Sequence, residues 1–121
     1  MTQVHIINLK DYEDTIYSNT NLTREEASTA ATYYWNKGLG IFEAIQSIRQ
    51  PPRFEIIEES KGEIISIDTY NDFWAAVQTC ITLDKATEKD FWVATYKHGM
   101  PERRVKPKKE DEGISLHFEK I

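Results

Sequence analysis

Apolar residues in the first half of the chain recur with the period of an α-helix, and this pattern predicts two helices, residues 23–37 and 41–50. Their inward-facing positions are Ala27, Ala30, Ala31 and Tyr34 in the first helix and Ile41, Ala44, Ile45 and Ile48 in the second. Thr23 and Glu26 have the spacing of a capping box, and Gly38 is suited to end the first helix. The two prolines at 51–52 end the second. Because the link between them is short, we expect the two helices to pack against each other.

Other stretches have the pattern of β-strands. Residues 4–9 are rich in β-branched side chains and apolar on both alternations, which is typical of an internal strand. The polar residues 11–20 predict a loop, with an edge strand as the alternative. Two isoleucine-rich runs, 53–60 and 63–68, surround a turn that contains Gly62 and predict a hairpin. Residues 114–118 alternate between apolar and polar and predict a final strand.

An eight-residue phrase, T-x-x-D-F-W-x-A, occurs twice, at residues 69–76 and 87–94. A threonine followed three residues later by an acid is typical of a helix start, so Thr69 and Thr87 are predicted N-caps. The phrase therefore predicts helices over residues 70–82 and 88–98. The first should bury Phe73, Ala76, Val77 and Cys80. The second has β-forming residues on both faces and is also compatible with a strand, but the Thr87 cap and Gly99 as a C-terminal stop favour a helix.

Together these elements predict one α+β domain spanning residues 1–121. Its antiparallel sheet would consist of the hairpin 53–68 with an N-terminal and a C-terminal strand, packed against about four helices. Residues 100–113 are expected to form a long charged loop. With 121 residues, of which 40% are hydrophobic, the chain is large enough to fold around a core without disulfides or metals.

Charge is distributed unevenly along the chain. The net charge is −5, yet residues 97–109 contain six basic residues and one acid, so this segment carries +5 and the remainder −10. The candidate residues for binding a polyanion or an acidic partner are Arg103, Arg104, Lys106, Lys108 and Lys109. Three interpretations are open for this segment: a solvated loop, a contact for phosphates or nucleic acid, or a contact for an acidic protein surface. We favour the acidic protein over nucleic acid, because the acidic remainder of the chain would repel an extended polyanion.

Three consecutive aromatic residues, Tyr33, Tyr34 and Trp35, form the candidate partner-binding site. They span more than half a turn of the predicted helix, so they cannot all point inward. At least one should be displayed to solvent or to a partner, and tyrosine and tryptophan are the residues most enriched at protein interfaces. Trp74 and Trp92 are expected to pack in or beside the core.

Catalytic and metal-binding patterns are missing from the sequence. The possible metal ligands His5, His98, His117 and Cys80 are scattered, without the spacing of a zinc site. The glycines stand at turns and caps, and no glycine-rich phosphate loop is present. Glu58 and Glu59 are adjacent in a predicted strand, so they should point to opposite faces. We therefore expect no metal, no cofactor and no enzymatic activity.

The expected function is that of a non-enzymatic binding protein that modulates or inhibits a protein partner. Its small, acidic, cofactor-free profile is shared by many immunity proteins, phage-encoded inhibitors and accessory subunits. The alternatives are a nucleic-acid-binding regulator that uses residues 97–109 and a small enzyme whose site is not visible in the sequence. A single cysteine, no membrane-length apolar stretch and no signal-peptide pattern predict a cytoplasmic protein. The oligomeric state, a homodimer included, stays open.

Overall fold

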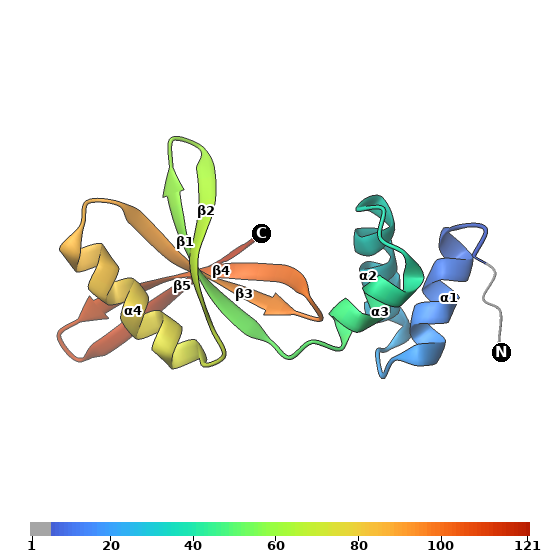
Figure 1. Ribbon diagram of the computed structural model, residues 1–121. Helices are drawn as coiled ribbons and strands as arrows, with labels where there is room; N and C mark the ends of the chain where they lie inside the picture. The colour runs from blue at the N-terminus through green and yellow to red at the C-terminus, as the bar shows by residue number, and fades with distance from the viewer. Residues whose placement is uncertain (1–5) are drawn as a thin grey trace. The chain divides into compact units, whose positions relative to one another are not determined.

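The computed structural model describes residues 6–121 and confirms the α+β class, with helices and a five-stranded antiparallel sheet (Figure 1). Contacts divide these residues into two compact units. The helical unit contains the described residues up to Pro51 together with His98–Met100, and the strand unit contains Pro52–Lys97 and Pro101–Ile121. Each unit has its own buried apolar cluster.

The helical unit is built from α1 (Leu9–Asn19), α2 (Arg24–Asn36) and α3 (Ile41–Ile48). All eight predicted inward-facing residues of α2 and α3 are buried, which confirms both helices. Their seam accommodates small residues, and Ala27, Ala30 and Ala31 are fully buried. The capping box is also confirmed, since the Thr23 hydroxyl accepts from the Glu26 N–H and the Glu26 carboxylate accepts from the Thr23 N–H. Gly38 has a φ of +74°, as a left-handed helix end requires.

Helix α1 corrects two predictions. Residues 11–20 were expected to form a loop, but Leu9–Asn19 is helical and begins at Asn8, whose side chain accepts from the Asp11 N–H. The helix buries mainly Tyr12 and Ile16, one turn apart, so its apolar pattern is too sparse to identify from the sequence. The predicted strand 4–9 is also wrong over residues 6–9, because Leu9 already belongs to α1. Its first residues, Val4 and His5, lie outside the described residues.

The strand unit contains the sheet, whose strands follow the order β2-β1-β3-β4-β5. Their bounds are β1 (Arg53–Ser60), β2 (Glu63–Tyr70), β3 (Asp90–Lys97), β4 (Met100–Glu110) and β5 (Gly113–Lys120). The β1–β2 hairpin and the final strand are confirmed. Lys61 and Gly62 at the hairpin turn have φ angles of +51° and +82°, as expected for a tight two-residue turn between twisted strands.

Helix α4 (Phe73–Ala86) packs on one face of the sheet. Its buried residues Ala76, Val77 and Cys80 contact strand residues such as Ile56 and Val93. We call the opposite side of the sheet the open face; it carries Ile57, Trp92, Ala94 and Tyr96. Burial raises the pKa of the Cys80 thiol to about 12, so this cysteine is a core residue without nucleophilic character.

Three further predictions for this unit are wrong. Residues 88–98 form strand β3 instead of a helix, and Thr87 is the C-cap of α4 instead of an N-cap. Thr69 lies in β2, and the N-cap of α4 is Asp72, whose side chain accepts from the Ala75 N–H. The expected charged loop 100–113 is strand β4 with its turn into β5, because its basic residues alternate with Val105 and Pro107, which are buried.

Among residues 6–121, no helix has both the length and the apolar character needed to cross a membrane.

Candidate protein-binding surface

The five basic residues of the candidate polyanion site all lie on strand β4, where alternate side chains point to opposite faces of the sheet. Arg104 lies on the open face, where its guanidinium donates to Glu59 Oε2 at 2.7 Å and to Glu119 Oε2 at 3.0 Å. The same group stacks 4.1 Å from the ring centre of Trp92. Partial burial lowers the pKa of Arg104, but the bonds to the two glutamates outweigh this effect and raise it. Arg104 is therefore neutralised within the unit.

Lys106 is neutralised in the same way. Its Nζ lies 2.9 Å from an oxygen of Asp84 and 2.7 Å from one of Asp90, and donates to the Phe91 carbonyl at 2.7 Å. Burial lowers the pKa of Lys106, and the hydrogen bonds to Asp90 and Asp84 overcome this and raise it. Lys106 thus joins the end of α4 to β3 and β4.

The remaining basic residues do not form a continuous patch. Arg103 lies 3.7 Å from Glu102 and stacks 4.7 Å from the ring centre of Phe118. Lys108 and Lys109 are exposed and form no ion pair with any described residue. The structure therefore leaves two of the five predicted residues fully available, beside the acidic turn 110–112.

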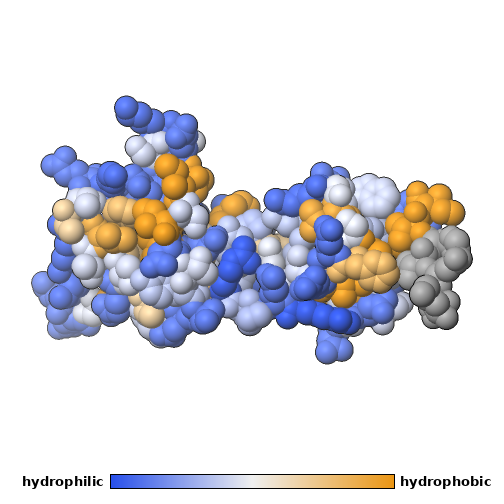
Figure 2. Space-filling model, in the orientation of Figure 1, coloured by the Kyte–Doolittle hydropathy of each residue, from blue (hydrophilic) through white to orange (hydrophobic). Residues whose placement is uncertain are grey.

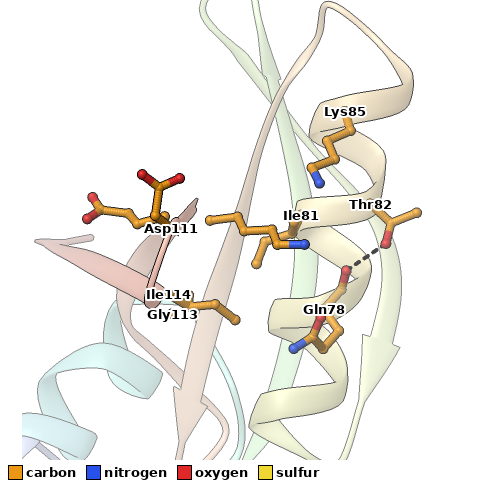
Figure 3. Close-up of a pocket in the computed structure, with 9 residues that line it drawn as sticks. Gln78, Ile81, Thr82, Lys85, Asp111, Gly113 and Ile114 are labelled. Atoms are coloured by element: carbon orange, nitrogen blue, oxygen red, sulfur yellow. Dashed lines mark hydrogen bonds between the residues drawn. The ribbon is translucent and has the colours of Figure 1, made fainter.

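Lys109 also lines a concavity of about 370 Å³ between α4 and the β4–β5 turn. Figure 3 shows Gln78, Ile81, Thr82 and Lys85 on the α4 wall and Asp111, Gly113 and Ile114 on the other wall. The cations Lys85 and Lys109 are balanced by Glu110 and Asp111 among the lining residues. This balance gives the concavity no preference for an anion.

The three candidate aromatic residues of α2 occupy different environments. Tyr34 is buried, and its hydroxyl donates to the His98 carbonyl at 2.7 Å. A Cβ at the neighbouring Gly99 would lie 2.5 Å from that hydroxyl oxygen, so glycine is required there. Tyr33 is half-buried beneath Lys37, and Trp35 is 39% exposed and packs edge-on against Tyr12. The candidate site is thus reduced to Trp35 with part of Tyr33, while Tyr34 is a core residue.

The sequence did not predict that a row of apolar residues would be exposed on an edge strand of the strand unit. Strand β2 forms one edge of the sheet and exposes Ile64, Ile65 and Ile67, at 58%, 51% and 47%. Figure 2 shows the corresponding group of hydrophobic side chains on the β1–β2 hairpin, below its hydrophilic tip. The signal in the sequence was the adjacent pair Ile64-Ile65. Neighbouring residues of a strand point to opposite faces, and apolar residues on both faces are normal only where both faces are covered.

The charges on β2 are acidic and unpaired. Glu63 and Asp68 flank the three isoleucines, and neither forms an ion pair with a described residue. By contrast, Glu58 and Glu59 on the neighbouring strand are paired with Lys89 and Arg104. Glu58 and Glu59 point to opposite faces of the sheet, as predicted. We use the name "β2 edge" for Glu63, Ile64, Ile65, Ile67 and Asp68.

The β2 edge continues onto the open face. Ile64 lies opposite Glu59 in the β1–β2 ladder, on the same face as Ile57. Both isoleucines line a shallow concavity of about 410 Å³ whose other apolar residues are Ala94, Tyr96, Pro101 and Ile121. Glu59, Arg104 and Lys120 complete its wall. Ile57 and Ala94 are themselves buried, so the apolar side chains of this concavity that are at least partly exposed are those of Ile64, Tyr96, Pro101 and Ile121.

Comparisons of the chain with protein-family models, with curated proteins and with solved structures find no match.

Proposed function

We propose that this chain is a non-enzymatic binding protein that modulates or blocks a protein partner, and that the β2 edge contacts the partner. The observation that carries this proposal is the row of three half-exposed isoleucines on an edge strand. Exposed strand edges promote association with other chains, and proteins ordinarily protect them with lysines, prolines or a covering segment. Strand β2 contains neither lysine nor proline.

The apolar contribution supports a protein partner. Full burial of an isoleucine contributes about 1.5–3 kcal/mol, so covering three that are already half-buried contributes roughly 2–4 kcal/mol. That amount is useful in an interface of ordinary size, because binding energy is concentrated in a few central apolar residues.

The charges weigh against nucleic acid as the partner. Arg104 and Lys106 are each held by two carboxylates, and the β2 edge is itself acidic. Of the five candidate basic residues, only Lys108 and Lys109 lack an ion-pair partner among the described residues, and they stand next to three acidic residues.

A capture experiment on host lysate tests this proposal. The wild-type chain, Ile65→Lys and the control Phe42→Lys would be immobilised at equal density, with and without nuclease treatment. Phe42 is an equally suitable exposed apolar residue of the helical unit. We expect nuclease-resistant capture of specific proteins by the wild type and by Phe42→Lys, and its loss in Ile65→Lys. Capture that nuclease removes, or that Ile65→Lys leaves unchanged, would contradict the proposal.

A further inference from the structure

We propose that the β2 edge binds an extended segment of the partner, as an added strand with apolar side chains at its centre and a lysine or arginine towards each end. This inference rests on the proposed function and specifies the chemistry of the segment that is recognised.

The backbone of β2 provides the first part of the recognition. Its inner side is paired with β1 from Glu63 to Tyr70, and no described strand lies on its outer side. The outward N–H and C=O groups of an edge strand bind an extended chain by the same ladder that joins the other strands. An added strand would therefore become the sixth of the sheet.

The isoleucines define which side chains the added strand needs. Ile64 lies on the open face beside Ile57, and Ile65 lies on the other face, opposite Glu58. A bound segment thus meets apolar surface on both of its faces near its centre. The ladder is irregular between Ile56 and Ile57, where β2 contains the extra residue Ile67. This bulge places a third exposed isoleucine on the edge and limits the regular ladder to a short stretch.

The charges on β2 indicate whether the added strand comes from a second copy of this chain or from a basic segment of another protein. Glu63 lies opposite Ser60 and Asp68 lies opposite Ile56, so the bulge at Ile67 leaves the two carboxylates four ladder positions apart, about 13 Å, on the same face of the sheet. Both lack an ion-pair partner among the described residues. A second copy paired through its own β2 would bring four such carboxylates together, and the two Lys61 side chains of the turns could balance at most half of them. A foreign segment with two cations at the matching spacing satisfies both carboxylates, so the charges favour a basic segment over self-pairing.

Peptide binding tests the inference directly. The probes are fluorescent eight-residue peptides with two lysines four positions apart, on one face of the strand, and valine, isoleucine, threonine or tyrosine at the other positions. A matched set has glutamate in place of lysine. A third set carries N-methyl groups on alternate backbone amides, which remove the hydrogen bonds of one side of the strand. Fluorescence anisotropy would be measured with the full chain at about 0.15 M salt.

We expect lysine peptides to bind at least tenfold more tightly than glutamate peptides. Only one of the two alternate N-methyl patterns should abolish binding, because a strand pairs along one side. Ile65→Thr and Ile65→Lys should each weaken binding at least tenfold, and Glu63→Lys with Asp68→Lys should reverse the preference between the peptide sets. Threonine retains β-propensity, so Ile65→Thr preserves the strand and removes apolar surface. Phe118→Lys on β5, the opposite edge, is the control and should bind like the wild type.

Several outcomes would overturn the inference. They are equal binding of lysine and glutamate peptides, insensitivity to both N-methyl patterns, or no binding by any lysine peptide at millimolar concentration. A dimer in analytical ultracentrifugation that Ile65→Lys dissociates would identify a second copy as the occupant and would also overturn it. If the peptides fail while lysate capture still depends on Ile65, the proposed function stands and only the extended-strand mode is rejected.

Discussion

The two copies of T-x-x-D-F-W-x-A adopt different secondary structures in the same unit. Residues 69–76 end a strand and begin helix α4, whereas residues 87–94 end that helix and begin strand β3. In the first copy Asp72 caps the helix through the Ala75 N–H. In the second, Asp90 accepts from the Trp92 indole N–H at 2.9 Å and binds Lys106. The same local sequence therefore begins a helix in one place and a strand in the other, according to its tertiary environment.

Burial shows why the copies diverge. Four consecutive residues of the second copy, 91–94, are buried, since β3 is the central strand with α4 on one face and open-face residues on the other. A helix at the edge of a layer cannot bury four consecutive side chains, because successive residues point in directions about 100° apart. In the first copy Ala76 is buried and Trp74 is 54% exposed, as on a helix with one covered side.

Replacing the matching tryptophans tests the difference between the two copies most directly. Trp92→Ala should lower the free energy of unfolding by about 3–5 kcal/mol, because it removes a large side chain that is only 8% exposed. Trp74→Ala should cost below about 1 kcal/mol. Urea unfolding followed by far-UV circular dichroism measures both. Trp92→Phe serves as the control and should cost less than Trp92→Ala; equal costs for the two alanine variants would contradict a buried β3.

A second prediction concerns the ionic role of Asp90, which Asp72 does not share. Lys106→Met should destabilise the chain by about 1–2 kcal/mol near neutral pH, less than for a fully buried pair because solvent screens these groups. Burial raises the pKa of Asp90, but its bonds to Lys106 and Trp92 outweigh this and lower the pKa below the ordinary 3.8. The contribution of the Asp90 carboxylate to the free energy of unfolding is therefore full above pH 3.8 and is lost as the pH falls through its lowered pKa.

The contribution of Lys106 to stability depends on pH in the opposite direction, because the pKa of Lys106 is raised above the ordinary 10.5. Its contribution is full below that pH and is lost as the pH rises through the raised value. Unfolding of the wild type and of Lys106→Met would be measured across about pH 2–12. The difference between their free energies of unfolding should be constant near neutrality and shrink at both extremes. A difference independent of pH would show that Lys106 contributes only through packing.

The smallest expected effects concern the caps. Asp72→Ala should cost about 0.5–2 kcal/mol, because the Ala75 N–H loses its acceptor at the start of α4. Thr69→Ala should cost below about 0.5 kcal/mol, since Thr69 is an exposed strand residue. Thr23→Ala, which breaks the observed capping box, provides the positive control. These losses in free energy of unfolding would be measured by thermal or urea unfolding. Equal losses for Thr69→Ala and Asp72→Ala would indicate that the helix begins three residues earlier, at Thr69.

The candidate site was only partly accessible from the sequence. The basic residues were identified correctly by type, but their neutralisation depends on Asp84, Asp90, Glu59 and Glu119, which are distant in sequence. The three aromatics of α2 were expected to differ in exposure, and the structure shows which of them is buried. The β2 edge was not recognised because the pair Ile64-Ile65 shows only that both faces of the strand are apolar, a pattern that fits a central strand as well as an uncovered edge strand. Which neighbour a strand has is a property of the topology.

Several elements can be predicted from local sequence information alone. Helices α2 and α3, the β1–β2 turn and the Thr23 capping box follow from periodicity, glycine conformation and hydrogen bonds between residues three or four positions apart. The conformations of β3, β4 and the sparsely apolar helix α1 depend instead on tertiary contacts. Each of these has weak or conflicting local preferences, and the burial of Trp92, Val105 and Ile16 against distant residues provides the free energy that selects one conformation.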